Sequence, residues 1–185
     1  MARRRRRSRS AGRGEPAPRL LLRAWILFLT ILVLGHVALE AAGPRYEARA
    51  NALTARTLDW ALSALGVDSR MIGDTVTGSA ASGEFALRII RECTAESPLV
   101  LLLAAILAYP CGLREKAVGL AIGVPSILLL NVVRLASLFW VGIVRPDLFD
   151  AAHVLVWQSL MVLAVVGLWL LWVRQWVERH APRPA

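Results

Sequence analysis

Cysteine and histidine are scarce in this chain of 185 residues, which carries two of the first and three of the second. Cys93 and Cys111 stand at the two ends of an apolar segment, roughly 27 Å apart at helical rise, whereas the Cα atoms of a disulfide lie within about 7 Å. A disulfide scaffold is therefore excluded. The same scattered residues do not build a tetrahedral metal site, and no phosphate-binding loop is present, so we expect neither a metal nor a cofactor.

Charged residues are also few, at 19% of the chain against 57% hydrophobic residues, and the mean hydropathy is +0.55. A soluble globular domain holds about half apolar and a quarter charged residues. The apolar residues form long runs rather than heptads, which excludes a coiled coil and a soluble enzyme. The composition therefore predicts one small integral membrane domain.

Positive charge is concentrated at the N-terminus, where residues 1–19 hold eight arginines and one glutamate. Arginine, serine, glycine and proline in this mixture bury almost nothing, so this segment is expected to be a disordered cytoplasmic tail. Nucleic acid is an alternative partner for such a run. The arginines directly precede the first apolar segment, however, where positive-inside topology accounts for them. We therefore expect membrane lipid as a partner and no nucleic acid.

The apolar runs predict an all-α membrane fold, a four-span helical bundle with a small extracytoplasmic α/β insertion. The integral domain covers 20–177, with spans at about 20–42, 97–111, 117–144 and 152–173, a loop at 43–96, and a cytoplasmic tail at 178–185. With the N-terminus inside, Arg114, Lys116 and the C-terminal arginines all fall on the cytoplasmic side of an inner membrane. A cleaved signal peptide is the alternative for the first span, but no small-residue cleavage site directly follows it.

The loop at 43–96 contains patterns of both helix and strand. Between Tyr46 and Leu65 leucines recur near helical spacing, at 53, 58, 62 and 65. Farther on, Met71–Thr77 and Glu84–Ile90 bracket the turn-like sequence GSAASG, and apolar residues alternate with polar ones in the second segment. We expect an amphipathic helix followed by a β-hairpin that returns the chain to the membrane.

Three reactive side chains fall on one side of the membrane in this topology. Cys93 precedes the second span, Arg134 lies in the outer part of the third, and His153 begins the fourth. Arg134 is roughly 15 Å below the outer end of its span at helical rise, a depth at which an arginine normally faces a partner or a water-filled cavity. Asn131, three residues earlier, adds a polar flank to the same helix.

Together these residues make chemical sense, because a thiolate is a nucleophile, a histidine transfers protons and an arginine holds an oxyanion. Asp150 stands three residues before His153 and can orient its ring if Pro146 opens the fourth helix. Glu92 and Glu96 flank the thiol and by themselves raise its pKa, so this hypothesis requires a nearby cation.

Each of these residues also has a purely structural interpretation. Arg134 can snorkel within an ion pair, Cys93 can be a small buried hydrophobe, and His153 can be an interface histidine. No function is assigned to His36 or His180. A non-enzymatic bundle, such as a transporter accessory or assembly subunit, is therefore the alternative to an enzyme. A rhomboid-like serine protease is disfavoured because GSAASG lacks the Gly-x-Ser-x-Gly pattern and lies in the polar loop.

Three motifs occur in a characteristic order: ECTAES around Cys93, NVVRLAS from Asn131 to Ser137, and AAHVLVW around His153. This order resembles the exosortase/archaeosortase family of membrane-embedded cysteine transpeptidases over about residues 67–173. The small size of the chain is similar to the short exosortase H branch.

The resemblance implies roles for three residues: Cys93 as the nucleophile, Arg134 as the stabiliser of the oxyanion or substrate, and His153 as the general acid/base. It also implies a substrate class, exported proteins whose C-terminal sorting signal combines a short motif, a hydrophobic helix and a basic tail. The expected activity is that of a thiol protease, which cleaves at the motif and transfers the new terminus to an acceptor at the outer face of the membrane.

Overall fold

The computed structural model describes residues 17–80 and 83–180; most of the arginine-rich segment predicted at 1–19 lies outside these described residues. The described chain is mostly helical with one small antiparallel sheet. The longer helices are α1 (Ala17–Ala41), α2 (Gly43–Ala64), α3 (Glu96–Ala108), α4 (Leu113–Val144) and α5 (Gln158–Trp172). The shorter helices are η1 (Arg91–Cys93), η2 (Pro146–Leu148), η3 (Ala151–Trp157), η4 (Val173–Val177) and α6 (Glu178–His180).

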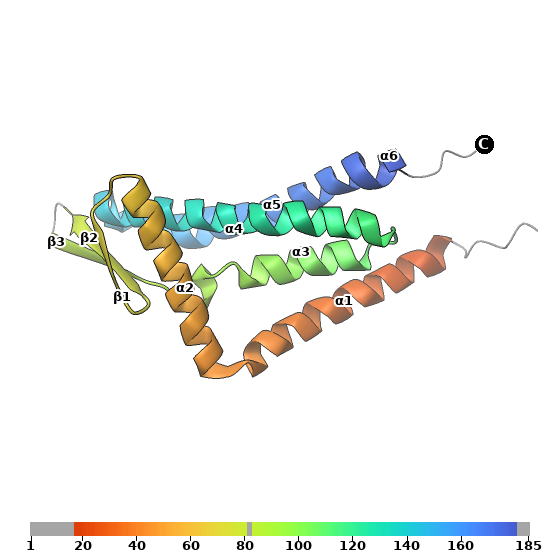
Figure 1. Ribbon diagram of the computed structural model, residues 1–185, viewed down its shortest axis with the longest axis horizontal. Coiled ribbons are helices and arrows are strands. Elements are labelled where there is room, and N and C mark those ends of the chain that lie inside the picture. Colours follow the sequence, from red (N-terminus) through yellow and green to blue (C-terminus); the bar gives the residue numbers. More distant parts are fainter. Residues whose placement is uncertain (1–16, 81–82, 181–185) are drawn as a thin grey trace, which may run out of the picture.

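Four of the helices, α1, α3, α4 and α5, run along the long axis of the molecule (Figure 1). α2 crosses this direction at one end, beside the sheet, and both ends of the described chain lie at the opposite end. The sheet consists of β1 (Ser69–Ile72), β2 (Thr75–Ala80) and β3 (Gly83–Arg88). A helical chain with a small α/β insertion at one end of the bundle is therefore confirmed.

Three described helices are long and apolar enough to cross a membrane, namely Pro18–Ala41, Leu113–Val144 and Ala151–Val177. α3 has 13 residues, about 20 Å at helical rise, and is short for a bilayer core of about 30 Å. The segment predicted at 97–111 ends its helix at Ala108, because Tyr109 precedes a proline and adopts extended backbone angles. The structure thus presents three candidate spans and one shorter apolar helix.

The third predicted span begins earlier than expected, at Leu113, and continues as one helix through Pro125. Its 32 residues correspond to about 48 Å, which exceeds the thickness of the bilayer core. Pro146 opens only the short helix η2; a π-helical segment, η3, then leads into α5. The fourth predicted span is therefore extended at both ends within the continuous apolar helix 151–177.

The amphipathic helix predicted from Tyr46 to Leu65 is present as α2, but its buried face differs from the predicted leucine face. Leu58 and Leu62 are buried, together with Asn51 and Ala55, whereas Leu53 and Leu65 are exposed by 66% and 72%. Positions 51, 55, 58 and 62 share one helical face and position 53 lies on the opposite one. Helical spacing alone therefore does not identify which leucines enter the core.

The predicted hairpin is part of a three-stranded sheet in the order β1-β2-β3. Met71–Thr77, expected as one strand, is divided by a turn at Gly73 and Asp74, and Ile72 pairs with Thr75 across it. Gly73 has a φ of 64°, which a glycine adopts without steric cost. The expected alternation in β3 is confirmed, since Leu87 is buried between exposed neighbours.

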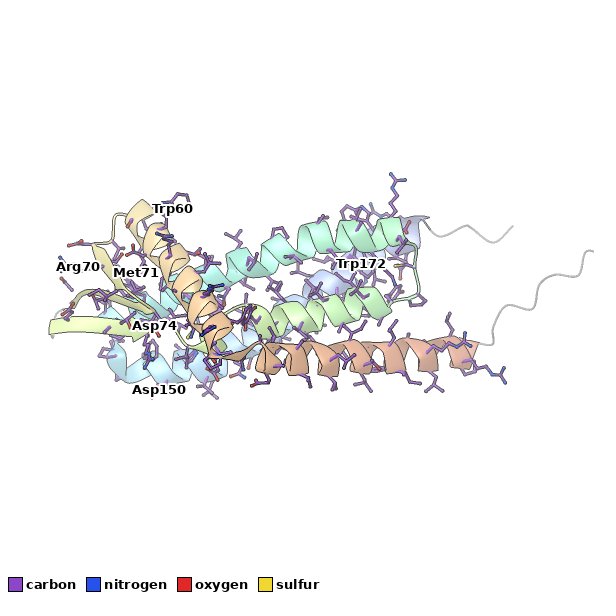
Figure 2. The ribbon with its side chains drawn as sticks, turned by 60° about the horizontal axis from the view of Figure 1, so that its bottom comes forward. Trp60, Arg70, Met71, Asp74, Asp150 and Trp172 are labelled. Carbon is purple, nitrogen blue, oxygen red and sulfur yellow. The ribbon has the colours of Figure 1, made fainter. Side chains whose placement is uncertain are left out.

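The sheet docks on the end of α4 through aromatic rings and glycines. The ring of Phe85 lies directly over Gly142, and Gly78 of β2 lies against Phe139. The rings of Phe85 and Phe139 pack edge to face, with centroids 5.7 Å apart. A second apolar cluster runs along the bundle from Ala95 to the far end, where Trp172, labelled in Figure 2, donates its indole N–H to the Glu115 carbonyl at 2.8 Å.

The close approach at Gly142 predicts the effect of one added methyl group. Gly142→Ala places a Cβ against the Phe85 ring and is expected to lower the free energy of unfolding by about 1–3 kcal/mol, as overpacking does. Gly167→Ala is the matched control, because nothing lies within 4 Å of the added Cβ and alanine favours the helix. Thermal unfolding in detergent measures both variants. Equal stability of the two variants would contradict this packing.

Candidate active site

α4 supplies two buried polar side chains one turn apart, Asn131 and Arg134. Their exposed fractions are 4% and 6%, and residues three apart on a helix project from the same face. At helical rise Asn131 lies about 27 Å along the helix from Leu113, and Arg134 lies about 15 Å before Val144. Both polar groups are therefore in the half of α4 nearer to the sheet.

Cys93 reaches this face of α4 from a different part of the chain. It ends the short helix η1, which follows β3, and its side chain is only 4% exposed. The Asn131 side-chain amide donates a hydrogen bond to the Cys93 backbone carbonyl at 3.0 Å. The cysteine is thus attached to α4 at the helical turn that carries Arg134.

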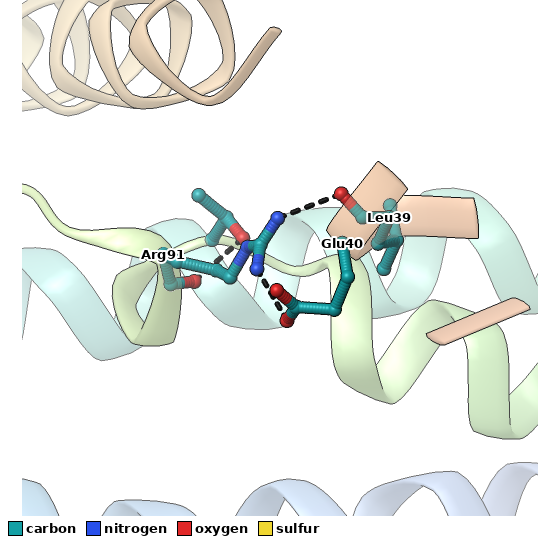
Figure 3. A network of polar contacts seen from close by, with 4 residues as sticks. Leu39, Glu40 and Arg91 are labelled. Atoms are coloured by element: carbon teal, nitrogen blue, oxygen red, sulfur yellow. Dashed lines mark hydrogen bonds and ion pairs between the residues drawn. The ribbon is translucent and has the colours of Figure 1, made fainter. Parts of the chain in front are cut away.

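Arg91, two residues before the cysteine, attaches η1 to the end of α1. Its guanidinium donates to the Glu40 carboxylate and, at 2.7 Å, to the Leu39 carbonyl (Figure 3). The Leu39 carbonyl belongs to the last turn of α1, where carbonyls lack helical partners, so Arg91 caps this helix. The sequence analysis did not identify Arg91; its position beside the cysteine is the only local signal, and Glu40 lies 51 residues away.

The pKa of the Cys93 thiol lies above its ordinary value, because burial in an apolar cluster disfavours the thiolate. A hydrogen bond from the Ile90 backbone and the positive charge of Arg134 lower this pKa, while the Glu92 carboxylate raises it. Arg134 is therefore the cation that the sequence analysis required, although burial outweighs its effect in the resting protein.

Glu96, the second acid expected beside the thiol, has another partner. A hydrogen bond between Glu96 and Tyr46 raises the pKa of that tyrosine. Burial of Tyr46 and the negative charge of Glu96 raise it further. Glu96 is not among the groups that shift the pKa of Cys93. It therefore links the first turn of α3 to α2 rather than acting on the thiol.

His153 lies in the π-helical segment η3, a type of helix found frequently at functional sites. Its ring packs on Phe149 with centroids 5.9 Å apart, and Phe149 packs in turn on Phe85. Arg134 and Asp150 are both close enough to interact with the ring electrostatically. Within residues 17–80 and 83–180 no hydrogen bond joins His153 to Asp150, so the predicted orienting role of this acid stays a prediction.

Two buried polar atoms on α4 have no hydrogen-bond partner in the described part of the chain, Oδ1 of Asn131 and Nε of Arg134. An unpaired buried polar atom costs about 1–3 kcal/mol, and a strained site, a catalytic role or a bound water or ion accounts for such atoms in native proteins. An amide oxygen accepts a hydrogen bond and a guanidinium N–H donates one. The pair therefore leaves one acceptor and one donor without a partner in the neighbourhood of a buried thiol.

The structure brings Cys93, Asn131 and Arg134 together. His153 interacts electrostatically with Arg134 and packs on Phe149, and in the described part of the chain no hydrogen bond joins it to Cys93. His36 bonds its own helix through the Leu32 carbonyl, and the side chain of His180 lies outside the described residues. Among the residues that the structure describes, no cluster of three His, Cys, Asp or Glu side chains could hold a metal ion.

Comparisons with known proteins add no relative to this description. Scanned against models of protein families, the sequence matches none. A search of curated proteins finds no match. A search of solved structures likewise finds no match.

The electrostatics of the thiol predict a pH profile for its alkylation by iodoacetamide. In a Cys111→Ala background the rate is expected to be low at neutral pH and to rise at a midpoint above that of an exposed thiol, because only the thiolate reacts. Arg134→Gln is expected to move the midpoint further up, since it removes the nearby cation. Glu92→Gln is expected to move it down.

Arg134→Lys is the control for this experiment, because it keeps the charge and is expected to shift the midpoint less than Arg134→Gln. An unchanged midpoint in Arg134→Gln, measured on protein that keeps its thermal unfolding midpoint, would show that the guanidinium does not act on the thiol.

Proposed function

We propose that this chain is a membrane-embedded cysteine endopeptidase and transpeptidase that processes exported proteins. The observation that carries the proposal is the attachment of Cys93 to α4 through Asn131, beside the buried guanidinium of Arg134. The unpaired Asn131 and Arg134 atoms support a peptide as the ligand. The expected substrate carries a C-terminal sorting signal with a short motif, a hydrophobic helix and a basic tail.

In the proposed reaction the Cys93 thiolate attacks the carbonyl carbon of the scissile peptide. Arg134 stabilises the oxyanion that forms, and His153 takes the thiol proton and returns it to the leaving amine. The C–N bond breaks and a thioester to Cys93 remains. An acceptor amine or water then attacks the thioester carbonyl, loses its proton to His153 and releases the thiol.

Arg134 has two roles in this proposal. The thiol of the resting protein is mostly protonated because it is buried, whereas the positive charge of Arg134 favours the thiolate. A substrate carbonyl that accepts a hydrogen bond from the same guanidinium lies beside the sulfur of Cys93, which attacks it. The proposal therefore requires Arg134 both for the thiolate and for the oxyanion.

The proposed topology has four membrane crossings with both termini in the cytoplasm and the site at the outer face of the inner membrane. α3 completes the crossing together with the extended segments on either side of it. In this proposed topology Cys93, which precedes the 13 residues of α3, lies nearer to the middle of the membrane than the end of α4 does, and this suits a substrate cleaved beside its own transmembrane helix. Arg114 and Lys116 lie at the proposed cytoplasmic end.

A non-catalytic bundle, such as a transporter accessory or assembly subunit, is the rival function. The observation that favours it is the burial of Cys93 in a cluster with Leu135 and Phe139, where a cysteine can act as a small hydrophobe. The two functions differ in what removal of the sulfur does to processing and to stability.

Replacing the nucleophile tests the proposal directly. The chain is co-expressed with an exported protein of the same genome whose C-terminus carries a short motif, an apolar segment and an arginine cluster. Cys93→Ala is expected to leave this precursor uncleaved on an immunoblot, while Cys111→Ala, the other free cysteine, processes it normally. Normal processing by Cys93→Ala, with the variant present in the membrane at equal level, would establish the non-catalytic bundle instead.

The two supporting residues are expected to differ in the size of their effects. Arg134→Gln is expected to slow cleavage by about 100- to 1000-fold, as loss of an oxyanion donor does. His153→Gln is expected to slow it by about 100- to 10,000-fold, as loss of a general base does. His36→Gln is the matched control, because the ring of this histidine bonds the Leu32 carbonyl of its own helix, α1. The initial rate of precursor cleavage measures all three variants.

A further inference from the structure

α2 has an outward face that the proposed chemistry does not use. Its buried face contains Asn51, Ala55, Leu58 and Leu62. At about 100° per residue, Leu53 and Trp60 project from the opposite side of the helix. Their exposed fractions are 66% and 80%, and Trp60 lies near the C-terminal end of α2 (Figure 2).

The surface between these two side chains is apolar. Thr57 lies between them, and its hydroxyl donates to the Leu53 carbonyl at 2.9 Å, so this hydroxyl is used within the helix. Ala64 continues the same stripe at the end of the helix. We call the residues Leu53, Thr57, Trp60 and Ala64 the outer stripe.

Three arginines lie along one flank of the outer stripe. Arg45, Arg49 and Arg56 are exposed, and their positions fall within about 40° of each other on the helix. No ion pair of these three is found in the described part of the chain. The nearest acid along this flank, Asp59, accepts a hydrogen bond from Ser69 at 2.7 Å.

The depth of α2 follows from its packing against α4. Leu58 and Leu62 belong to the same cluster as Leu135 and Phe139. If α4 enters the hydrocarbon near Lys116, Leu135 lies about 29 Å and Phe139 about 35 Å farther along, at or just beyond a core of about 30 Å. α2 crosses the bundle at this level (Figure 1), so with this point of entry it lies at the height of the membrane headgroups.

We propose that α2 is an interfacial helix that binds anionic phospholipids of the leaflet at this end of the bundle. Leu53 and Trp60 insert among the upper acyl chains, while Arg45, Arg49 and Arg56 bind lipid phosphates. An apolar stripe with an aromatic residue beside a row of arginines is the pattern of helices that lie in the membrane interface. Lipid is favoured over a protein partner because the neighbouring helices place this face at headgroup level. The inference does not depend on the proposed catalytic activity.

The position of the outer stripe is tested with a fluorophore on the full-length chain in lipid nanodiscs. Both native cysteines are first removed by Cys93→Ala and Cys111→Ala. Bimane is then attached to a new cysteine at Leu53→Cys. The control carries bimane at Glu84→Cys, an exposed position of β3. At residue 53 brominated lipid is expected to quench the label and aqueous iodide is not, and the reverse is expected at residue 84. Equal iodide quenching at both positions, or protection of residue 53 from both quenchers by a protein partner, would overturn the proposal.

The headgroup preference is tested with the same label at residue 53. Brominated phosphatidylglycerol is expected to quench at lower mole fraction than brominated phosphatidylcholine. Arg49→Gln with Arg56→Gln should reduce this preference roughly five-fold per arginine removed. Arg70→Gln, at an exposed position of β1 labelled in Figure 2, is expected to retain it. Equal quenching by the two lipids, or a preference that survives the double variant, would overturn the binding of anionic lipid.

Discussion

The hydrogen bond from Asn131 to the Cys93 carbonyl is the contact on which the geometry of the site depends. It joins two segments 38 residues apart and attaches the irregular chain around η1 to the longest helix of the bundle. A buried hydrogen bond contributes only about 0.5–1.5 kcal/mol net, but loss of the donor leaves a buried carbonyl unpaired. Asn131 therefore determines where the thiol lies relative to Arg134, its neighbour one turn along α4.

The position of Cys93 is determined from three sides. Asn131 attaches it to α4, the Arg91 contacts attach its short helix to the end of α1, and β3 leads into it from a sheet docked on Gly142. Because α3 has only 13 residues and α4 has 32, α4 extends beyond Cys93 along the long axis of the bundle. These contacts hold the Cys93 thiol at a defined position, as the proposed site requires.

Opposing physical effects meet at the thiol. Burial among apolar side chains raises its pKa, and the guanidinium of Arg134 lowers it. The same apolar surroundings leave the Asn131 oxygen and the Arg134 Nε without partners. Each unpaired buried polar atom costs about 1–3 kcal/mol of stability. In the proposed peptide-processing activity a substrate supplies the missing hydrogen bonds.

The sequence by itself determined the features that local patterns encode. Long apolar runs predicted the three helices that are long enough to cross a membrane, helical spacing predicted α2, and alternation from Phe85 to Ile89 predicted β3, because each depends on residues close together in the chain. The polar residues Cys93, Asn131 and Arg134 were also identifiable, since polar groups stand out in apolar surroundings. How these residues lie relative to one another was not.

Only the tertiary structure decided which predicted features meet. The contact of Arg91 with Glu40, the bond from Asn131 to Cys93 and the exposure of Leu53 depend on segments far apart in sequence. The turn at Gly73 and the end of α3 before Pro110 both have local causes. The strand pairing that follows from the turn, and the position of Cys93 along the bundle that follows from the short α3, are set only when the elements pack together. Periodicity specifies the faces of an element, whereas the surface against which each face is buried depends on the packing of the whole chain.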